Sequence, residues 1–417
     1  MIATEGLHHR RTSCRLCKSD QLELVLKLEP TPPANAFVPE SLKGIEQPRF
    51  PLDVFFCNSC THLQLLDVVD AKMLFENYVY VSGTSPVFIQ HFKNYSQDII
   101  NRYHPQPNSL VVDIGSNDGT LLSFFKDSGF RVLGVDPARD IAAEATTRGI
   151  KTICGFFTQK LAEEIISACG QASIITANNV FAHADDLSEI THGVKALLAP
   201  DGVFSFEVSY LADVVEKTLF DTIYHEHVAF HSVRPLVTFL KHHGLELIEA
   251  VRVDSHGGSL RAIAQKSGGP HPRGSSVDEL ISLEDSMGLN KIETFKSFSE
   301  NIELLKKELS ELLKNLKTQG AKIAGFGAPA KATTLMYHFG IGPEVIDYVI
   351  DDSPLKQNLY TPGMHIPVVN GQAIHEKKPD YLLILAWNFA DSIIKRNQAY
   401  LDSGGHFIVP LPKVSII

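Results

Sequence analysis

One segment of this 417-residue chain constrains its fold more than any other, the stretch from residue 110 to residue 136. It contains the apolar run LVVDI, the glycine-rich turn GSNDG, a short helical stretch and a second apolar run, RVLGVD. This order is typical of a parallel β-sheet with helices on both faces. Apolar runs at residues 174–177 and 202–208 continue the alternation. We therefore predict an α/β fold for the centre of the chain.

The acidic residues of this segment indicate which ligand the turn accepts. Glycines at the first strand-to-helix turn let the backbone approach a nucleotide, and Asp136 at the end of the next strand is placed to bond ribose hydroxyls. The carboxylate of Asp113 would repel phosphates but would hold a cationic methionyl group. The spacing resembles the first two motifs of class I S-adenosylmethionine-dependent methyltransferases; alternatively, the glycines serve only tight turns. The predicted cofactor contacts are Asp113, Gly115, Asn117, Gly119, Asp136, Pro137 and Asn178.

Four of the six cysteines form two C-x-x-C pairs, Cys14 with Cys17 and Cys57 with Cys60. In a protein of the reducing cytoplasm, two such pairs favour one tetrahedral zinc site, because each pair binds one side of the ion. Four thiolates leave no position for water, so we expect a structural zinc. The alternatives are two unrelated pairs of buried thiols, or a redox pair.

The rest of the chain divides around this core. Residues 1–72 form the predicted zinc-binding domain and residues 73–272 the predicted methyltransferase core. The Gly/Pro/Ser-rich stretch KSGGPHPRGSS is the clearest linker, and a long amphipathic helix follows it. A second α/β alternation then begins, so residues 273–417 are predicted to form a Rossmann-like domain.

The segment Tyr224-His225-Glu226-His227 with His231 holds the densest concentration of titratable groups. It follows an apolar run, and loops at the carboxyl ends of strands line the cofactor crevice. Histidine transfers protons readily near neutral pH, so we interpret this segment as acid/base groups. A metal site formed by His225, His227 and His231, or a solvated histidine face, are the alternatives.

Six motifs occur together in this chain in a fixed order. They are Cys14-x-x-Cys17 with Cys57-x-x-Cys60, Asp113-x-Gly115, Asn179 with His183, Tyr224-His225-Glu226-His227, His256-Gly257-Gly258-Ser259-Leu260-Arg261 and Gly325-Phe-Gly327-Ala-Pro-Ala-Lys331. Over nearly its whole length the chain resembles the sugar C-methyltransferases that act on nucleotide-linked 4-keto sugars, such as those of tetronitrose-type sugar biosynthesis. This resemblance implies the same three-domain fold.

The resemblance also implies roles for individual residues. His227 corresponds to the base that removes the proton at C3 of the sugar. The other implied catalytic residues are Tyr224, Glu226, His183, Asn179 and Tyr78, with Tyr80 as the competitor of Tyr78. The implied substrate is a dTDP- or GDP-linked 4-keto deoxysugar. The predicted substrate contacts are His225, Arg261, Gly325, Gly327, Ala328, Lys331 and Asp352.

The C-terminal glycine turn supports a second interpretation. Gly325-Phe-Gly327-Ala-Pro-Ala330 reads almost as G-x-G-x-x-A after a strand, and Asp351-Asp352 follows the next strand. Alone, this pattern is typical of an NAD-dependent oxidoreductase. The resemblance instead implies a nucleotide-sugar cradle at this turn. A non-enzymatic zinc-containing binding protein is a third hypothesis.

Composition limits the partners. The formal net charge of −10 argues against nucleic acid and anionic membranes, which both reward an excess of Lys and Arg. The apolar run at residues 381–387 is too short to span a bilayer, and the N-terminus has no signal-like apolar segment. We therefore expect a cytoplasmic enzyme that acts as a monomer on a nucleotide-linked sugar, with no membrane or nucleic-acid partner.

Overall fold

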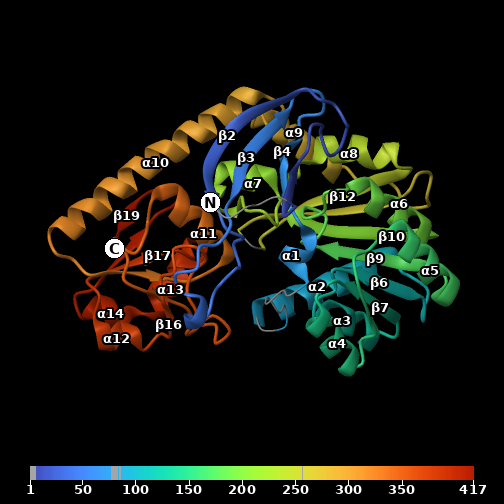
Figure 1. The fold of residues 1–417 in the computed structure, drawn as a ribbon. Coiled ribbons are helices and arrows are strands. Elements are labelled where there is room, and N and C mark those ends of the chain that lie inside the picture. Colours follow the sequence, from blue (N-terminus) through green and yellow to red (C-terminus); the bar gives the residue numbers. More distant parts are fainter. Residues whose placement is uncertain (1–5, 77–82, 84–85, 256) are drawn as a thin grey trace.

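The computed structural model describes residues 6–76, 83, 86–255 and 257–417. Figure 1 shows an N-terminal antiparallel sheet between a central sheet and a C-terminal α/β domain. Tyr78, Tyr80 and His256 of the sequence motifs lie outside the described residues.

The N-terminal domain is built from short antiparallel strands. Its elements are β1 (His8–Arg10), β2 (Leu22–Thr31), the 3-10 helix η1 (Glu40–Leu42), β3 (Phe50–Cys57), β4 (Leu63–Leu65) and β5 (Asp67–Val69). Strand β1 pairs with β5, and the larger sheet has the order β11-β4-β3-β2. Strand β11 (Ala229–Phe230) comes from the central domain and pairs with β4. The N-terminal sheet therefore includes the chain that follows His227 directly.

The central sheet has seven strands in the order β12-β13-β10-β9-β6-β7-β8. Its elements are α1 (Ala71–Phe75), α2 (Pro86–Tyr103), β6 (Leu110–Ile114), α3 (Thr120–Asp127), β7 (Arg131–Asp136), α4 (Arg139–Thr147), β8 (Thr152–Cys154), α5 (Gln159–Cys169), β9 (Ala172–Asn178), α6 (Leu187–Leu197), β10 (Leu198–Ser209), α7 (Leu211–Glu216), the 3-10 helix η3 (Phe220–Thr222), α8 (Val233–His242), β12 (Leu245–Val253) and β13 (Ser259–Lys266). Strand β13 runs antiparallel to both of its neighbours. The strand order reverses direction between β6 and β9, where the carboxyl ends of parallel strands form a ligand crevice.

The C-terminal domain contains a second, mainly parallel sheet, ordered β16-β15-β14-β17-β18-β19. Its elements are α9 (Ser276–Ser286), α10 (Ile292–Thr318), β14 (Ile323–Phe326), α11 (Ala330–Phe339), β15 (Val349–Ile350), β16 (Val368–Val369), α12 (Ala373–Lys377), β17 (Tyr381–Ile384), the 3-10 helix η4 (Trp387–Phe389), α13 (Ala390–Arg396), α14 (Gln398–Asp402), β18 (His406–Val409) and β19 (Ser415–Ile416). Helix α10 spans from this domain toward the N-terminal sheet in Figure 1. The predicted fold class is confirmed, with two Rossmann-like units and a small N-terminal domain.

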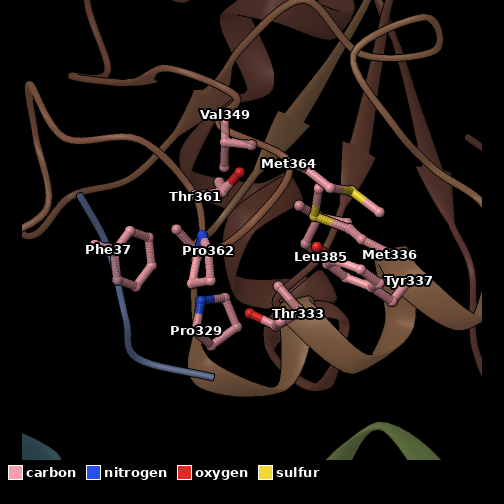
Figure 2. Close-up of a pocket in the computed structure, with 12 residues that line it drawn as sticks. Phe37, Pro329, Thr333, Met336, Tyr337, Val349, Thr361, Pro362, Met364 and Leu385 are labelled. Atoms are coloured by element: carbon pink, nitrogen blue, oxygen red, sulfur yellow. The ribbon is translucent and has the colours of Figure 1, made fainter. Parts of the chain in front are cut away.

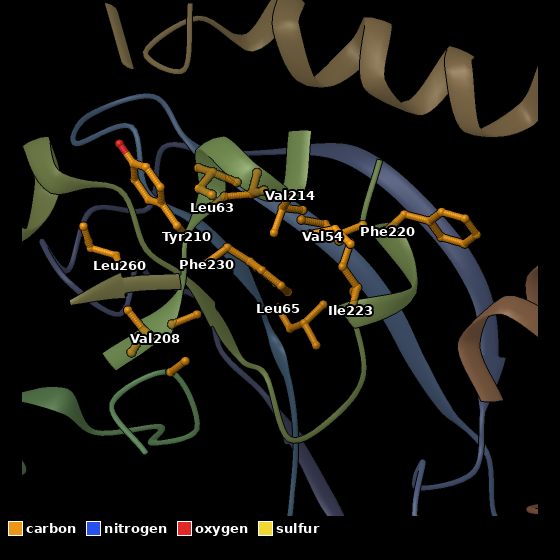
Figure 3. Packing of buried hydrophobic residues seen from close by; sticks show 14 of the residues in the cluster. Val54, Leu63, Leu65, Val208, Tyr210, Val214, Phe220, Ile223, Phe230 and Leu260 are labelled. Carbon is orange, nitrogen blue, oxygen red and sulfur yellow. The ribbon is translucent and has the colours of Figure 1, made fainter. Parts of the chain in front are cut away.

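The N-terminal sheet and the central domain share one apolar core. Figure 3 shows the contributing side chains, among them Val54, Leu63, Leu65, Val214, Ile223 and Phe230. All are almost fully buried. Because interiors pack densely, a shift in either domain is transmitted to the other. The segment around Tyr224–His227 is therefore held from both sides. Among the described helices, none is long and apolar enough to cross a membrane.

Candidate active site

The four cysteines of the two pairs meet at one point. Their sulfur atoms lie within 4.8 Å of one another, and the Cys14–Cys60 and Cys17–Cys57 Sγ distances are both 3.6 Å. A tetrahedral zinc with Zn–S bonds of about 2.3 Å separates its sulfurs by about 3.8 Å, so the site fits this ion. Lys18 and Thr61 directly follow the two cysteine pairs, and both have a left-handed backbone conformation that closes the turn.

The first glycine turn is shaped by close packing. Gly115 has φ +70°, and a Cβ there would lie 2.2 Å from Val180 Cγ2. Gly119 has φ +77°, and a Cβ there would meet Ile150 at 2.8 Å. Both positions therefore require glycine. Asn117 between them also has a positive φ of 50°, which asparagine tolerates better than most residues.

Asp136 holds this turn against the neighbouring strand. Its Oδ2 accepts a hydrogen bond from the Asn117 amide at 2.8 Å, and its Oδ1 accepts one from the Ala138 amide at 2.8 Å. Pro137 is half-buried and lies between Asp136 and Ala138 in the chain. Burial raises the pKa of Asp136 above its ordinary value, while these amides oppose the shift. Each carboxylate oxygen keeps a second lone pair, so ribose hydroxyls remain compatible with this clamp.

Asp113 lies deeper than the other residues of the turn. Its side chain faces β9, where the Thr176 hydroxyl donates to Asp113 Oδ1 at 2.6 Å. Burial, together with the nearby charge of Asp136, raises the pKa of Asp113 to about 7. The predicted cation-holding carboxylate is therefore only partly ionised at neutral pH.

Two polar side chains beside the turn, those of Asn178 and Ser116, have atoms without a hydrogen-bond partner in the described part of the chain. Among the described residues, neither the Nδ2 nor the Oδ1 atom of Asn178 has a hydrogen-bond partner, and both atoms are buried. The buried Ser116 hydroxyl is likewise unbonded. Buried polar groups are nearly always satisfied, so these atoms indicate a polar ligand at the carboxyl end of β9. The site thus fits the nucleoside half of S-adenosylmethionine.

Aromatic rings from distant segments meet next to this crevice. The rings of Tyr224 and His227 lie 4.2 Å apart, and those of His183 and His227 lie 5.0 Å apart. Phe75 of α1 stacks on His183 with its ring centroid 5.6 Å away. Asn179, which follows β9 directly, has a positive φ of 55° and donates its amide to the Glu207 carbonyl. Three of the predicted catalytic residues, Tyr224, His183 and His227, are therefore in contact.

The orientation of His227 assigns its proton. Nδ1 of His227 lies 2.7 Å from the carbonyl oxygen of Thr222. A carbonyl only accepts hydrogen bonds, so Nδ1 carries the proton of the neutral ring and Nε2 carries the lone pair. An imidazole held in this tautomer is arranged as a general base.

A residue of the N-terminal domain enters this site. Asn35 Nδ2 donates to Oε1 of the buried Glu226 at 2.8 Å. The neighbouring Ala34 carbonyl accepts from Thr333 of α11 at 3.1 Å, so all three domains meet here. Sequence reasoning missed Asn35, because one asparagine in a proline-rich loop carries no periodic signal. Its only mark is the local segment PPANAF.

His225 is packed against the N-terminal domain, and its contact with the substrate stays a prediction. Its ring is buried against Phe50, and Nε2 bonds the Phe50 carbonyl at 3.1 Å. Burial lowers the pKa of His225 to about 4, which keeps it neutral. His225 therefore joins the N-terminal domain to the core. In the described part of the chain, the four cysteines are the one group arranged to hold a metal, so the histidine-metal alternative finds no support.

Arg261 is also occupied internally. Its guanidinium lies 2.6 Å from Glu207 Oε1 and 4.2 Å above the Tyr95 ring. Arg261 and Glu207 face each other across the β10–β13 pair. His91 Nε2 contacts the other Glu207 oxygen at 2.8 Å. This ion pair holds Arg261 within the central sheet, and its contact with the substrate stays a prediction.

The amides of the C-terminal glycine turn, at Gly325, Gly327 and Ala328, each donate to an acceptor within the protein. The Gly327 amide donates to the Ile350 carbonyl at 2.7 Å, and the Ala328 amide donates to the Asp351 carboxylate at 2.6 Å. Gly325 lies within β14, where a Cβ would crowd Leu385 at 3.0 Å. In this structure a carboxylate thus binds the Ala328 amide, and the contacts of Gly325, Gly327 and Ala328 with a nucleotide sugar stay predictions. Among the described residues, no observation favours the oxidoreductase alternative.

Lys331 and Asp352 also have other partners. Lys331 Nζ lies 3.6 Å from buried Asp221 and 4.2 Å above the Trp387 ring, and Trp387 donates to Asp221 at 2.6 Å. Lys331 therefore joins the C-terminal domain to the segment that precedes Tyr224. Asp352 is exposed and pairs with Arg396 at 2.8 Å. The predicted phosphate and sugar contacts of the two residues stay predictions.

An apolar pocket beside α11 receives the N-terminal segment. Figure 2 shows Phe37 opposite Pro329, Thr333 and Pro362, which line the same pocket. Backbone bonds between Val38 and Tyr360 hold this segment on the C-terminal domain. The loop that carries Asn35 is therefore anchored close to the site.

Comparisons with known proteins agree with these features. Three family models match successive parts of the chain: "Putative zinc binding domain" at residues 14–75, "Methyltransferase domain" at residues 88–250 and "C-methyltransferase C-terminal domain" at residues 254–412. The chain is 36% identical to the C-methyltransferase NovU of Streptomyces niveus, over 97% of this chain and 96% of that protein. The predicted limits at residues 72 and 272 stay predictions.

Solved structures give more distant matches. An S-adenosylmethionine-dependent methyltransferase from Clostridium acetobutylicum is 14% identical with a TM-score of 0.35, covering 43% of this chain and 92% of that chain. Magnesium protoporphyrin IX methyltransferase from Synechocystis with bound SAH is 18% identical with a TM-score of 0.33, and the match covers 43% of this chain and 83% of that chain.

Proposed function

This chain belongs to the C-methyltransferase family and is an S-adenosylmethionine-dependent, zinc-binding methyltransferase, and we propose that it methylates C3 of a nucleotide-linked 4-keto deoxysugar. The observation that carries this proposal is His227, whose Nδ1–H bond to the Thr222 carbonyl leaves Nε2 as a base. Either dTDP or GDP is compatible as the nucleotide. The acceptor position and the base are parts of the proposal.

His227 begins the proposed reaction. A 4-keto group acidifies the proton at C3, and Nε2 of His227 accepts that proton. The electrons of the C3–H bond then form an enolate with its charge on the C4 oxygen. When bound, S-adenosylmethionine supplies the electrophilic methyl group that C3 takes up. Because the acceptor must be held close to this methyl group, positioning contributes much of the acceleration.

The neighbouring polar groups stabilise the enolate in this proposal. The rings of Tyr224 and His183 contact His227, and in this proposal Tyr224, His183 and Asn179 each direct a donor to the C4 oxygen. One such donor contributes about 3–4 kcal/mol in comparable sites. Glu226 polarises the histidines and is itself held by Asn35. Tyr78 keeps its proposed catalytic role, outside the described residues.

The cofactor contacts follow the first glycine turn. We assign the methionyl and nucleoside parts to the turn and its neighbours: Asp113, Gly115, Asn117, Gly119, Asp136, Pro137 and Asn178. The monomeric state, the cytoplasmic location and the lack of a nucleic-acid partner stay predictions.

A screen of 4-keto nucleotide sugars tests the proposed function. Mass spectrometry with S-adenosylmethionine should show the gain of one CH2 unit for the true acceptor. In D2O with S-adenosylhomocysteine in place of the methyl donor, the same sugar should exchange its C3 proton. Methyl gain on oxygen or nitrogen, without exchange at C3, would contradict the proposal.

Binding of the cofactor should depend on pH through Asp113. Below about pH 7 this buried acid is protonated, and the neutral form loses its attraction for the ligand's cationic ammonium group. We expect S-adenosylhomocysteine affinity, measured by calorimetry, to fall up to about tenfold from pH 8 to pH 6. Asp113→Asn should bind with little pH dependence. An equal pH dependence in both proteins would assign the effect to another group.

Asn35 should matter for turnover and not for cofactor binding. Loss of its hydrogen bond to Glu226 in Asn35→Asp should lower kcat about ten- to hundredfold at pH 8, where two carboxylates oppose each other. At lower pH the introduced carboxyl group is protonated and donates a hydrogen bond as asparagine does, so the defect should shrink. The measurement is kcat across pH for the wild type and the variant.

Asn290→Asp provides the matched control for this experiment. Asn290 also donates to a carboxylate, that of Asp285 at 3.1 Å, but on an exposed surface. This variant should keep the wild-type pH profile. An Asn35→Asp defect that stays constant across pH would show that Asn35 does not act through Glu226.

A further inference from the structure

Arg15 is a buried cation that the proposed chemistry does not use. It lies between Cys14 and Cys17 of the first knuckle, and its side chain is 0% exposed. A guanidinium stays charged at neutral pH and has a rigid planar fork of donors. Burying such a charge is costly, so its contacts must be extensive.

The donors of Arg15 reach three separate segments. Nη1 donates to the Gln64 side chain at 3.2 Å, to the Leu65 carbonyl at 3.0 Å and to the Val228 carbonyl at 2.9 Å. Nη2 donates to Asp185 Oδ1 at 3.1 Å. One rigid group thus contacts the N-terminal sheet and two loops of the central domain.

These two loops carry the central histidines of the site. Val228 follows His227 directly, and Asp185 lies two residues after His183. The amides of Val228 and Ala229 both donate to the Ala182 carbonyl, which already joins the loops. Arg15 adds a second bridge between the two loops, because its guanidinium donates both to the Val228 carbonyl and to Asp185. Its planar fork restricts the separation between the loops, and with it the separation of the two rings.

The zinc knuckle determines where this fork lies. Cys14 and Cys17 belong to the metal cluster, and the Arg15 amide donates to Gln64 Oε1 at 2.9 Å. The backbone of Arg15 is therefore held by the two metal-binding cysteines that flank it in the knuckle and by Gln64 of the adjacent sheet. We propose that Arg15 is a positioning residue that couples the zinc knuckle to the spacing of His183 and His227. This inference rests on the proposed function of His227.

Arg11 provides a matched control. Its Nη1 donates to the same Asp185 oxygen at 2.9 Å, but in the described structure its side chain bonds Ser13 and Asp185 and not Val228. Arg11→Met removes a cation from the same acid without removing the bridge between the loops. It should keep kcat within about twofold of wild type.

Kinetics of Arg15→Met test the positioning role. We expect kcat to fall about a hundredfold, with KM, zinc content and S-adenosylhomocysteine affinity within about twofold of wild type. Arg15→Lys should restore about a tenth of the lost activity, because one ammonium cannot reach both loops. In the background of His227→Asn, Arg15→Met should cost nothing further. Wild-type kcat in Arg15→Met, or additive losses in the double variant, would overturn the proposal.

Two further experiments distinguish loss of zinc in Arg15→Met, and failure of the proposed function, from failure of the positioning role. If the Arg15→Met protein loses its zinc, the Asp185→Asn variant is used in its place, because the partly exposed Asp185 holds one end of the Arg15 bridge between the loops. It should lower kcat about tenfold with zinc retained; unchanged kcat would overturn the proposal. If the wild-type enzyme methylates no keto sugar, the proposed function fails, and ¹⁵N NMR of His227 tests Arg15 alone. The Nδ1-protonated signal should dominate in wild type and broaden or shift in Arg15→Met; identical spectra would overturn the proposal.

Discussion

His227→Asn should lower the rates of C3 proton exchange and of methyl transfer by about a thousandfold. The asparagine amide can still donate toward the Thr222 carbonyl, so the local backbone contact survives while the base at Nε2 is lost. S-adenosylhomocysteine should bind with its wild-type affinity, because the glycine turn lies on other loops. Proton exchange followed by NMR, together with calorimetry, measures both quantities.

His242→Asn is the control for this substitution. His242 also places Nδ1 on a backbone carbonyl, that of Thr238 at 2.8 Å, but on an exposed helix surface. Its replacement should change neither rate. If His227→Asn retained full exchange activity, a different group would have to be the base, and Glu226 would be the next residue to test.

Loss of zinc should have the second largest effect. Cys57→Ser replaces a fully buried ligand at the end of β3. Structural zinc contributes about 10 kcal/mol to the folding of small domains, so we expect zinc loss and a melting temperature lowered by about 10 °C. Turnover should fall further than S-adenosylhomocysteine affinity, because β11 behind His227 pairs with the zinc domain. Elemental analysis, calorimetry and turnover give the comparison.

Cys154→Ser is the matched substitution outside the metal site. Cys154 is an exposed thiol at the end of β8, so zinc content and melting temperature should not change. A Cys57→Ser protein with full zinc and wild-type stability would contradict the four-thiolate site.

Both Rossmann-like units hold their glycine turn with an acidic side chain. Asp136 holds the first glycine turn through the Asn117 amide, and Asp351 holds the second through the Ala328 amide. An acidic residue at the end of the second strand is placed to bond ribose hydroxyls in both units. The core turn is the one that we assign to S-adenosylmethionine.

The features that could be predicted from the sequence are those encoded by residues close together in the chain. The glycine turn of residues 115–119, the strand ending at Asp136 and the two cysteine pairs are encoded within a few residues each, and short-range backbone geometry follows from them. The alternation of buried strands and helices likewise predicted both α/β units. These features include the glycine turn that lines the cofactor crevice.

Only the tertiary structure decided which polar side chains serve the site. His225 and His227 are two residues apart in an irregular loop, so no periodicity distinguishes the ring buried on Phe50 from the ring beside Tyr224. Arg261 found its partner on a neighbouring strand, in Glu207. Asn35 and Arg15 reach the site from another domain. Such contacts join residues far apart in the chain, and the free energy of burying a charge or an amide depends on partners that no local pattern specifies.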